Sequence, residues 1–322
     1  MLIYDDTKYK THTFDDEMVA NIERQYDTKV LFAGSFGTCV YGINNRFSDV
    51  DFKCICDSRE KTHWRHYNKE MMTDIWALDI SYVKELGKQY LKQIGQFPSV
   101  LHRNKGIRVD AHDIIRYDYG IQIFLEILYS DYIWDSGYLK ENYEELLKEN
   151  SLVGAVDYYY SRAYGHRHNH LITENVNVRY ALMCFVNTCI CKWLLERGSV
   201  PYVDCRFLVE EYATMEFKDW LLAALKMQKS ITLQQGEVYR DIHTNIERFG
   251  TEDLFSVPVE KLKKDGEPQE RKPKAYVEMC PEFLIWIDKQ LEELDYAMNQ
   301  IPLDTGIALG ESSLYARTIC GV

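Results

Sequence analysis

The sequence predicts an α+β protein, in which a short mixed sheet with helices is followed by an all-helical part. Short apolar runs bounded by polar residues occur in the first third of the chain, and we expect strands at 29–33, 49–56 and 74–81. From about residue 111 onward, apolar residues recur at helical spacing instead. We therefore expect a mixed domain over 1–120, a helical domain over 121–300 and a C-terminal tail over 301–322.

The expected helices have recognisable start and stop signals. Asp15 and Asp16 can cap a helix over 17–26, because a carboxylate at the N-cap accepts hydrogen bonds from the first free N–H groups. Gly198, followed by Pro201, ends another helix. The other expected helices cover 82–94, 114–129, 138–148, 153–163, 177–197, 207–228 and 281–300, with a connection at 57–73 and an exposed loop at 261–275.

The composition is that of an ordinary globular protein, since 46% of the 322 residues are hydrophobic and 27% are charged. The nine cysteines lack the paired CxxC spacing of a zinc site, so we expect reduced thiols and a cytoplasmic protein. The first ten residues lack the basic start and apolar stretch of a signal peptide. No apolar run approaches the roughly 20 residues of a membrane span, so no membrane partner is expected.

The net charge of −12 argues against a protein that coats nucleic acid without specificity. A local basic site stays open, because residues 80–108 are rich in lysine and arginine. Lys84, Lys88 and Lys92 recur every four residues, which is also the pattern of a solvated helix face. We favour the solvated face over a surface for nucleotides or polyanions.

The clearest chemical signal lies between residues 34 and 51. Asp49 and Asp51 are two apart on an expected strand, so their carboxylates leave one face with Cα atoms roughly 6.5–7 Å apart. Two such carboxylates repel each other, whereas Mg²⁺ binds one or two carboxylates together with substrate phosphates. Gly34 and Ser35 follow the preceding strand, where backbone N–H groups and the Ser35 hydroxyl can face an anion at the start of the next helix.

A third carboxylate on a neighbouring strand would allow two metal ions, about 3.5–4 Å apart, for in-line phosphoryl displacement. We choose Asp79, because it lies within the expected strand beside the small residues Ala77 and Ser81. Asp74 is the competitor, but at the start of that strand it is as easily a cap or turn residue. Ser-Asp-x-Asp alone is a weak motif, and its weight comes from this context.

Together these residues resemble the DNA polymerase β-like nucleotidyltransferase superfamily, whose pattern is Gly-Ser, then Asp-x-Asp, then a lone Asp on a later strand. Within it, the chain is similar to the YcgL/RlaP-like predicted nucleotidyltransferases, which are associated with RNA repair. The segments that carry this closer similarity are 41–51, 79–86, 97–101, 179–194 and 199–201. Met183 and His102 depart from the group, since a basic and an acidic residue are usual there.

The resemblance implies an N-terminal catalytic domain and a helical domain that completes the substrate cleft. Gly34 and Ser35 would hold the triphosphate of an incoming NTP. Asp49, Asp51 and Asp79 would bind two Mg²⁺ ions, for which Mn²⁺ can substitute, and Asp79 would help to deprotonate the acceptor hydroxyl. The expected nucleotide-binding set is completed by Ser48, Lys84 and Arg179.

The resulting hypothesis is Mg²⁺-dependent transfer of a nucleoside monophosphate from an NTP to a hydroxyl, with release of pyrophosphate. The acceptor is open among an RNA end, a small molecule and a protein side chain. Two alternatives also stay open: a non-catalytic nucleotide- or RNA-binding module of the same fold, and a synthase of cyclic or oligomeric nucleotide signals.

Residues 165–170 form the most histidine-dense stretch. On a helix, His166 and His170 would share a face at a spacing that fits zinc, but no acid or cysteine pair lies nearby in the sequence. A surface that contacts phosphates or bases, together with Arg162 and Arg179, is the better functional interpretation. A solvated turn between helices is the plain alternative.

Overall fold

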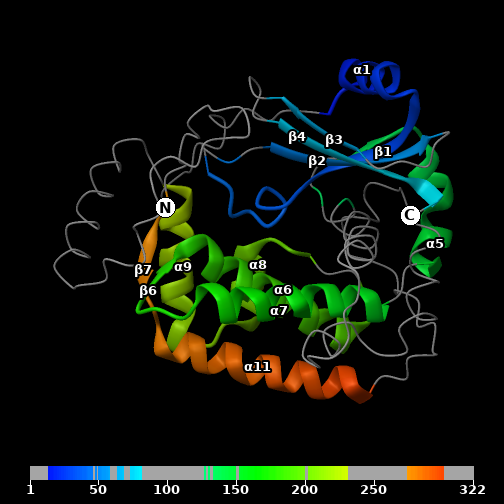
Figure 1. Cartoon of the computed structure of the whole chain (residues 1–322). Coiled ribbons are helices and arrows are strands. Elements are labelled where there is room, and N and C mark those ends of the chain that lie inside the picture. The colour runs from blue at the N-terminus through cyan, green and yellow to red at the C-terminus, as the bar shows by residue number, and fades with distance from the viewer. Residues whose placement is uncertain are drawn as a thin grey trace, which may run out of the picture.

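The computed structural model describes residues 14–45, 48, 50–58, 64–68, 73–81, 127, 130, 133–149, 152–199, 202–230 and 274–300. Within them the chain is a mixed α+β protein, with a small mixed sheet and a layer of helices. Figure 1 shows that α1 (Asp16–Tyr26) lies on one face of the sheet and the long helices lie on the other.

Five strands form the sheet in the spatial order β3-β4-β2-β1-β5. Their bounds are Thr28–Phe36 (β1), Val50–Ser58 (β2), Trp64–Asn68 (β3), Thr73–Asp79 (β4) and Ile133–Asp135 (β5). The β1–β2, β1–β5 and β3–β4 pairs are antiparallel, whereas β2 and β4 are parallel. Because parallel strands start at the same end of a sheet, the beginning of β4 lies beside the beginning of β2.

Both faces of the sheet are buried, and the alternation of side chains along each strand separates them. On the α1 face, Phe52 and Cys54 of β2 pack with Ile22 of α1. On the helix face, Ile55 of β2 and Leu78 of β4 join the core of the helical layer. Odd-numbered positions of β2 therefore belong to the helix face.

A bulge in β1 adjusts this alternation. The register with β2 shifts between Val30 and Phe32, so the consecutive residues Leu31 and Phe32 both pack on the helix face. The carbonyl oxygen of Leu31 accepts hydrogen bonds from the Ser136 N–H at 3.0 Å and the Ser136 hydroxyl at 2.7 Å. The bulge thereby helps to fix the chain just after β5 against β1.

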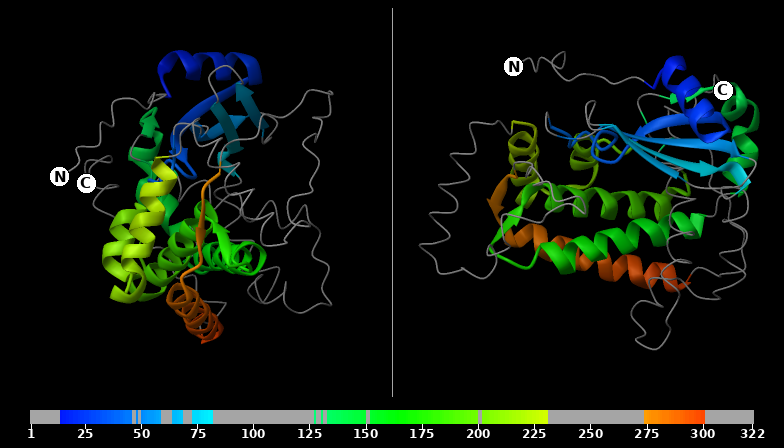
Figure 2. Two further views of the ribbon diagram at one scale, coloured as in Figure 1. Left: turned by 90° about the vertical axis from the view of Figure 1, so that its left-hand side faces the viewer. Right: turned by 45° about the horizontal axis from the view of Figure 1, so that its top comes forward.

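The helical layer is built around α7 (Val178–Arg197), most of which is buried. By length and composition α7 could cross a membrane, but 72% of its most apolar window is buried in the protein, as in the core helix of a soluble protein. The other helices are α5 (Tyr138–Glu149), α6 (Leu152–His170), α8 (Cys205–Tyr212), α9 (Met215–Lys229) and α11 (Pro281–Gln300). Figure 2 shows α11 along the outer side of this layer and α5 at the edge of the sheet.

Three regions differ from the sequence-based expectation. The helix expected over 207–228 is two helices, α8 and α9, because Ala213 is extended and Thr214 is the N-cap of α9. The stretch 57–73 contains the edge strand β3, which lacks a clear apolar alternation. A small two-stranded sheet, β6 (Asn175–Asn177) with β7 (Tyr276–Glu278), was not expected.

Other expectations are met or lie outside the described residues. Asp15 caps α1 as expected, since its Oδ1 accepts from the Met18 N–H at 2.9 Å. Every cysteine in the described part is a free thiol, as expected. Strand β5 pairs with β1 although it lies beyond residue 120. The domain boundary itself stays a prediction, because 82–126 is outside the described residues.

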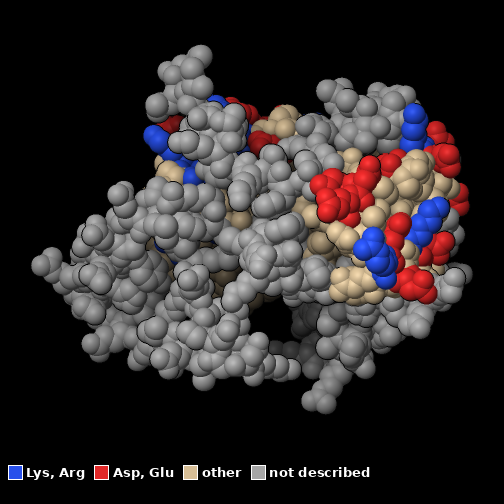
Figure 3. All heavy atoms as spheres, turned by 90° about the horizontal axis from the view of Figure 1, so that it is seen from above, with Lys and Arg blue, Asp and Glu red and all other residues tan. Residues whose placement is uncertain are grey.

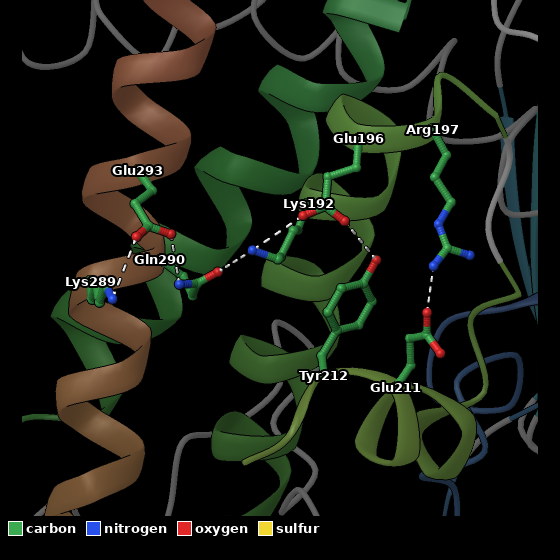
Figure 4. A network of polar contacts seen from close by, with 8 residues as sticks. All are labelled: Lys192, Glu196, Arg197, Glu211, Tyr212, Lys289, Gln290 and Glu293. Atoms are coloured by element: carbon green, nitrogen blue, oxygen red, sulfur yellow. Dashed lines mark hydrogen bonds and ion pairs between the residues drawn. The ribbon is translucent and has the colours of Figure 1, made fainter.

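A network of polar contacts joins α7 to α8 and α11 (Figure 4). The Lys192 ammonium donates to Gln290 Oε1 at 2.9 Å and lies 3.2 Å from Glu196 Oε1. The Gln290 amide, which is 6% exposed, donates in turn to Glu293 Oε2 at 2.9 Å. The Tyr212 hydroxyl of α8 lies 3.5 Å from Glu196 Oε2. Since both polar groups of the buried amide have partners, the network fixes α11 against α7 without an unsatisfied amide.

The loop after β1 is attached to the helical layer at Gly42. This residue has a φ of +63°, and a side chain there would collide with the carboxylate of Asp204, the N-cap of α8. The Cys205 N–H also donates to the Tyr41 carbonyl oxygen at 2.9 Å. Glycine is therefore favoured at position 42 for two reasons: the backbone is left-handed there, and the Asp204 carboxylate lies too close for a side chain.

We expect Gly42→Ala to lower the free energy of unfolding by about 2–3 kcal/mol, because it adds a collision to an unfavourable backbone conformation. Gly198 is the matched control: it has the same φ of +63° but nothing within 4 Å, so Gly198→Ala should cost only about 1 kcal/mol. Urea unfolding of the two variants gives the comparison. Equal losses would contradict the packing of this loop against α8.

Candidate functional site

The end of β1 and the start of β2 meet at one end of the sheet. In the antiparallel register, Gly34 lies opposite Lys53 and Phe36 lies opposite Asp51. In the parallel register, Asp74 at the start of β4 lies beside Asp51. We call this place, with Gly34, Ser35, Phe36, Asp51 and Lys53, the Asp51 end.

The loop that follows β1 turns across the Asp51 carboxylate. A Cβ at Gly37 would lie 3.3 Å from Asp51 Oδ2, and Gly37 has a φ of +70°, which only glycine adopts readily. Cys39 lies further along this loop: burial raises the pKa of its thiol to about 12, the Asp51 charge also raises it, and Arg179 lowers it. A carboxylate of the sheet and a guanidinium of α7 therefore both act on this loop.

Ser35 does not stand at a helix N-terminus, so that expectation was wrong. Strand β1 continues through Phe36, and residues 37–42 form turns. The Ser35 N–H donates to Ser130 Oγ at 3.0 Å, and the two hydroxyl oxygens lie 2.8 Å apart. A Cβ at Gly34 would lie only 3.1 Å from Ser130 Cβ. The Gly-Ser pair thus allows residue 130 to approach β1 closely, which the sequence did not reveal.

Lys53 is a site residue that the sequence reasoning missed. It is 1% exposed, shares the helix face with Asp51 and Ile55, and its Nζ lies 4.1 Å from the centre of the Phe36 ring. A lysine is rarely fully buried without a functional or structural partner. The signal in the sequence was a single lysine inside the apolar run 52–56.

Asp79 is not part of the Asp51 end, which corrects its placement as the third metal ligand. In the parallel register Asp79 lies beside Cys56, five positions beyond Asp51, or roughly 16 Å along the strands. It also belongs to the opposite face, because Cys56 packs on the α1 side. Asp79 and Asp51, which the sequence led us to group together, therefore do not converge.

Asp79 instead closes the other end of β2 and β4. It is 2% exposed, and its Oδ2 accepts from the Ser58 N–H at 2.8 Å and the Ser58 hydroxyl at 2.9 Å. Its Oδ1 accepts from the Ser81 N–H at 2.9 Å and from the Ser81 hydroxyl. Burial alone would raise the pKa of Asp79, but these hydrogen bonds together lower it. The carboxylate is thus held ionised in a structural role.

The other predicted site residues have separate outcomes. Asp49 and Lys84 lie outside the described residues, so the Asp49–Asp51 pair stays a prediction. Ser48 Oγ accepts from the Asn45 N–H at 3.0 Å, so this hydroxyl is used within the loop before β2. Among the residues that the structure describes, no group of three or more His, Cys, Asp or Glu side chains could hold a metal ion.

A scan against models of protein families finds no match, and neither does a search of curated protein sequences. The function is therefore argued from the residues of the Asp51 end and from the resemblance of the sequence motifs.

Proposed function

We propose that the protein is a metal-dependent nucleotidyltransferase with a polymerase β-like core, which transfers a nucleoside monophosphate from an NTP to a hydroxyl acceptor. The observation that carries the proposal is that the end of β1, which follows Gly34–Ser35, lies beside the start of β2, where Phe36 is opposite Asp51. In the superfamily that the motifs resemble, these two elements hold the triphosphate and the metal ions.

The donor chemistry of the Asp51 end fits magnesium. Asp51 offers a half-buried carboxylate, and the sequence has a second carboxylate, Asp49, two positions before it. Asp74 replaces Asp79 as the candidate third ligand, because its backbone lies beside Asp51 in the register. When bound, Mg²⁺ would neutralise phosphate charge and orient the attacking and leaving oxygens.

Positively charged residues flank this carboxylate site. Lys53 is buried on the same face as Asp51, and Arg179 lies close enough to the following loop to lower the pKa of Cys39. Fixed cations in a site with little water stabilise charge that develops on a phosphoryl group. Lys53 and Arg179 would therefore hold the triphosphate, while Ser35 and Ser130 could donate to it only by giving up their mutual hydrogen bond.

The activity can be tested with each α-labelled NTP, Mg²⁺ and three acceptor classes: an RNA oligonucleotide, small-molecule hydroxyls and the protein itself. We expect transfer of label to one class and release of pyrophosphate, both abolished by EDTA and restored by Mg²⁺ or Mn²⁺. Nucleotide binding without transfer to any of the three would contradict the enzyme and favour the non-catalytic module.

We expect Lys53→Met to lower kcat/KM for the NTP at least about tenfold, because it removes one fixed cation from the site. The same change should also lower the free energy of unfolding, because it removes a buried cation that contacts the Phe36 ring and shares a face with Asp51. The kinetics are therefore measured on folded protein, well below the urea midpoint. Lys226→Met on the exposed surface of α9 is the control for the charge change. Unaltered kinetics in Lys53→Met would exclude Lys53 from the site.

A further inference from the structure

Basic and aromatic side chains gather where α6 ends and α7 begins. Arg162, His166 and His170 are spaced by four residues on α6 and so form one stripe. Arg179 and Tyr180 belong to the first turn of α7, which packs beside that stripe. We call these five residues the α6–α7 cluster. The histidine-dense stretch is thus the end of a helix, and the plain expectation of a solvated turn was wrong.

Stacked rings hold the imidazoles of the cluster in place. The His170 ring lies over the Tyr180 ring, with the ring centres 3.9 Å apart and the planes at 11°. The His166 ring centre lies 5.8 Å from the centres of both His170 and Tyr180. These contacts set the orientation of His166 toward its neighbours, while His170 keeps an exposed position.

His166 lies in a positive electrostatic environment. Burial lowers the pKa of His166 to about 3, and Arg162, His170 and Arg179 lower it further, so the imidazole is neutral at physiological pH. Every charged group that acts on it from α6 and α7 in the described part is cationic. Its Nδ1 is buried and has no hydrogen-bond partner among the described residues. Arg162 and Arg179 thus both act on His166, and the Arg162 guanidinium is oriented in part by its Nη1, which donates to the Tyr158 hydroxyl at 2.5 Å.

We propose that the α6–α7 cluster binds a phosphate group, with Arg162 and Arg179 as charged donors and His166 as a third donor. Guanidinium groups suit phosphate because their N–H groups can bind two of its oxygens at once. A bound phosphate would relieve the repulsion among the cations and favour the protonated imidazole, which donates through both ring nitrogens. Arg179 is the one residue that belongs both to this phosphate site and to the proposed nucleotidyl-transfer site. The phosphate site does not depend on the nucleotidyl-transfer activity.

The electrostatics of the rest of the molecule are consistent with a local site. In Figure 3, acidic side chains with some basic ones among them gather on the side that carries α1 and α5. A chain with a net charge of −12 repels polyanions from most of its surface. Binding of phosphate at the cluster would therefore depend on the local cations Arg162 and Arg179 and not on a general positive field.

Two sources of the phosphate can be told apart. The phosphate could be inorganic, or it could belong to a nucleotide whose base stacks on the exposed ring of His170. We expect a nucleoside monophosphate to bind at least about tenfold more tightly than inorganic phosphate if stacking contributes. If the unmodified protein prefers the nucleoside monophosphate and His170→Ala loses that preference, the ligand is a nucleotide. If the unmodified protein binds the nucleoside monophosphate and inorganic phosphate equally well, the ligand is phosphate alone. Either result supports the site.

The test is an NMR titration of the His166 imidazole in the full-length protein, with the resonance assigned from His166→Gln. Without phosphate we expect no protonation of His166 between about pH 5 and 8, and with saturating inorganic phosphate or nucleoside monophosphate we expect it to titrate within that range. An unchanged His166 titration with both probes would overturn the proposal.

Variants give a second readout that does not depend on the assignment. The Arg179 side chain lies on the surface. Arg179→Gln should weaken the binding of inorganic phosphate at least about tenfold, because one charge-assisted hydrogen bond is lost. Arg162→Gln should act in the same direction. Arg206→Gln on the exposed face of α8 makes the same change in net charge and should leave the affinity unaltered. Equal affinities in Arg179→Gln and Arg206→Gln would also overturn the site, whether or not nucleotidyl transfer is found.

Discussion

Replacing Asp51 with asparagine is expected to lower the rate of nucleotidyl transfer by at least about 10²-fold, because the variant loses a charge that a metal-bound triphosphate requires. The shape of the side chain is kept, and relief of a half-buried charge offsets the lost interactions. We therefore expect the free energy of unfolding to change by less than about 1 kcal/mol. The measurements are label transfer from the NTP and urea unfolding of the same preparations.

The matched control for this experiment is Asp219→Asn. Asp219 is exposed on α9, and its replacement makes the same change in net charge far along the chain from β2. Transfer by Asp219→Asn should equal that of the unmodified protein. If Asp51→Asn and Asp219→Asn transfer label equally well, Asp51 has no part in the reaction.

Replacing Asp79 with alanine is expected to destabilise the fold by about 3 kcal/mol or more. The change removes all four hydrogen bonds to the carboxylate and leaves the buried N–H group of Ser58 and that of Ser81 without their acceptor. In urea the midpoint should fall with little change in the slope. Loss of transfer with unchanged stability would return Asp79 to the reaction and contradict its structural role.

The contribution of Asp79 to the free energy of unfolding should also depend on pH in a defined direction. Its pKa is lower in the folded protein than in the unfolded chain, so the ionised carboxylate stabilises the fold above the unfolded value of about 3.9. This stability is lost as the pH falls through the folded pKa. The difference in stability between the unmodified protein and Asp79→Asn should therefore be constant near neutrality and shrink below about pH 4. A difference that grows in acid would contradict the lowered pKa.

The sequence predicted which side chains share a face of one strand, but not how strands align. A strand through Asp51 was expected and is present as β2, in which Asp51 lies on the face opposite to that of Phe52 and Cys54. In β4 the alternation was also readable, yet it could not show that Asp74, and not Asp79, lies beside Asp51. Register and strand direction depend on pairing between distant segments. The alternation of side chains is the same in every register that differs by two residues, so it cannot select one of them.

Long-range contacts account for the other differences at the site. The partner of Ser35 is Ser130, 95 residues further along the chain, and no local pattern around Gly34–Ser35 indicates that contact. Lys53 was visible as a charge in an apolar run, but its burial beside Phe36 follows from the packing of helices on that face. Helix ends were easier to predict, because caps such as Asp15 act within a few residues.

The most direct test of the account is to locate the metal ion itself. Mn²⁺ broadens NMR signals of nearby groups in a way that falls steeply with distance, and the two ends of β2 differ by roughly 16 Å in the register. With substoichiometric Mn²⁺ and an NTP, we expect loss of the amide signals of Ser35 and Gly37 at the Asp51 end, while those of Ser58 and Ser81 persist. Broadening of Ser58 and Ser81 with intact Ser35 and Gly37 would contradict a metal site at Asp51.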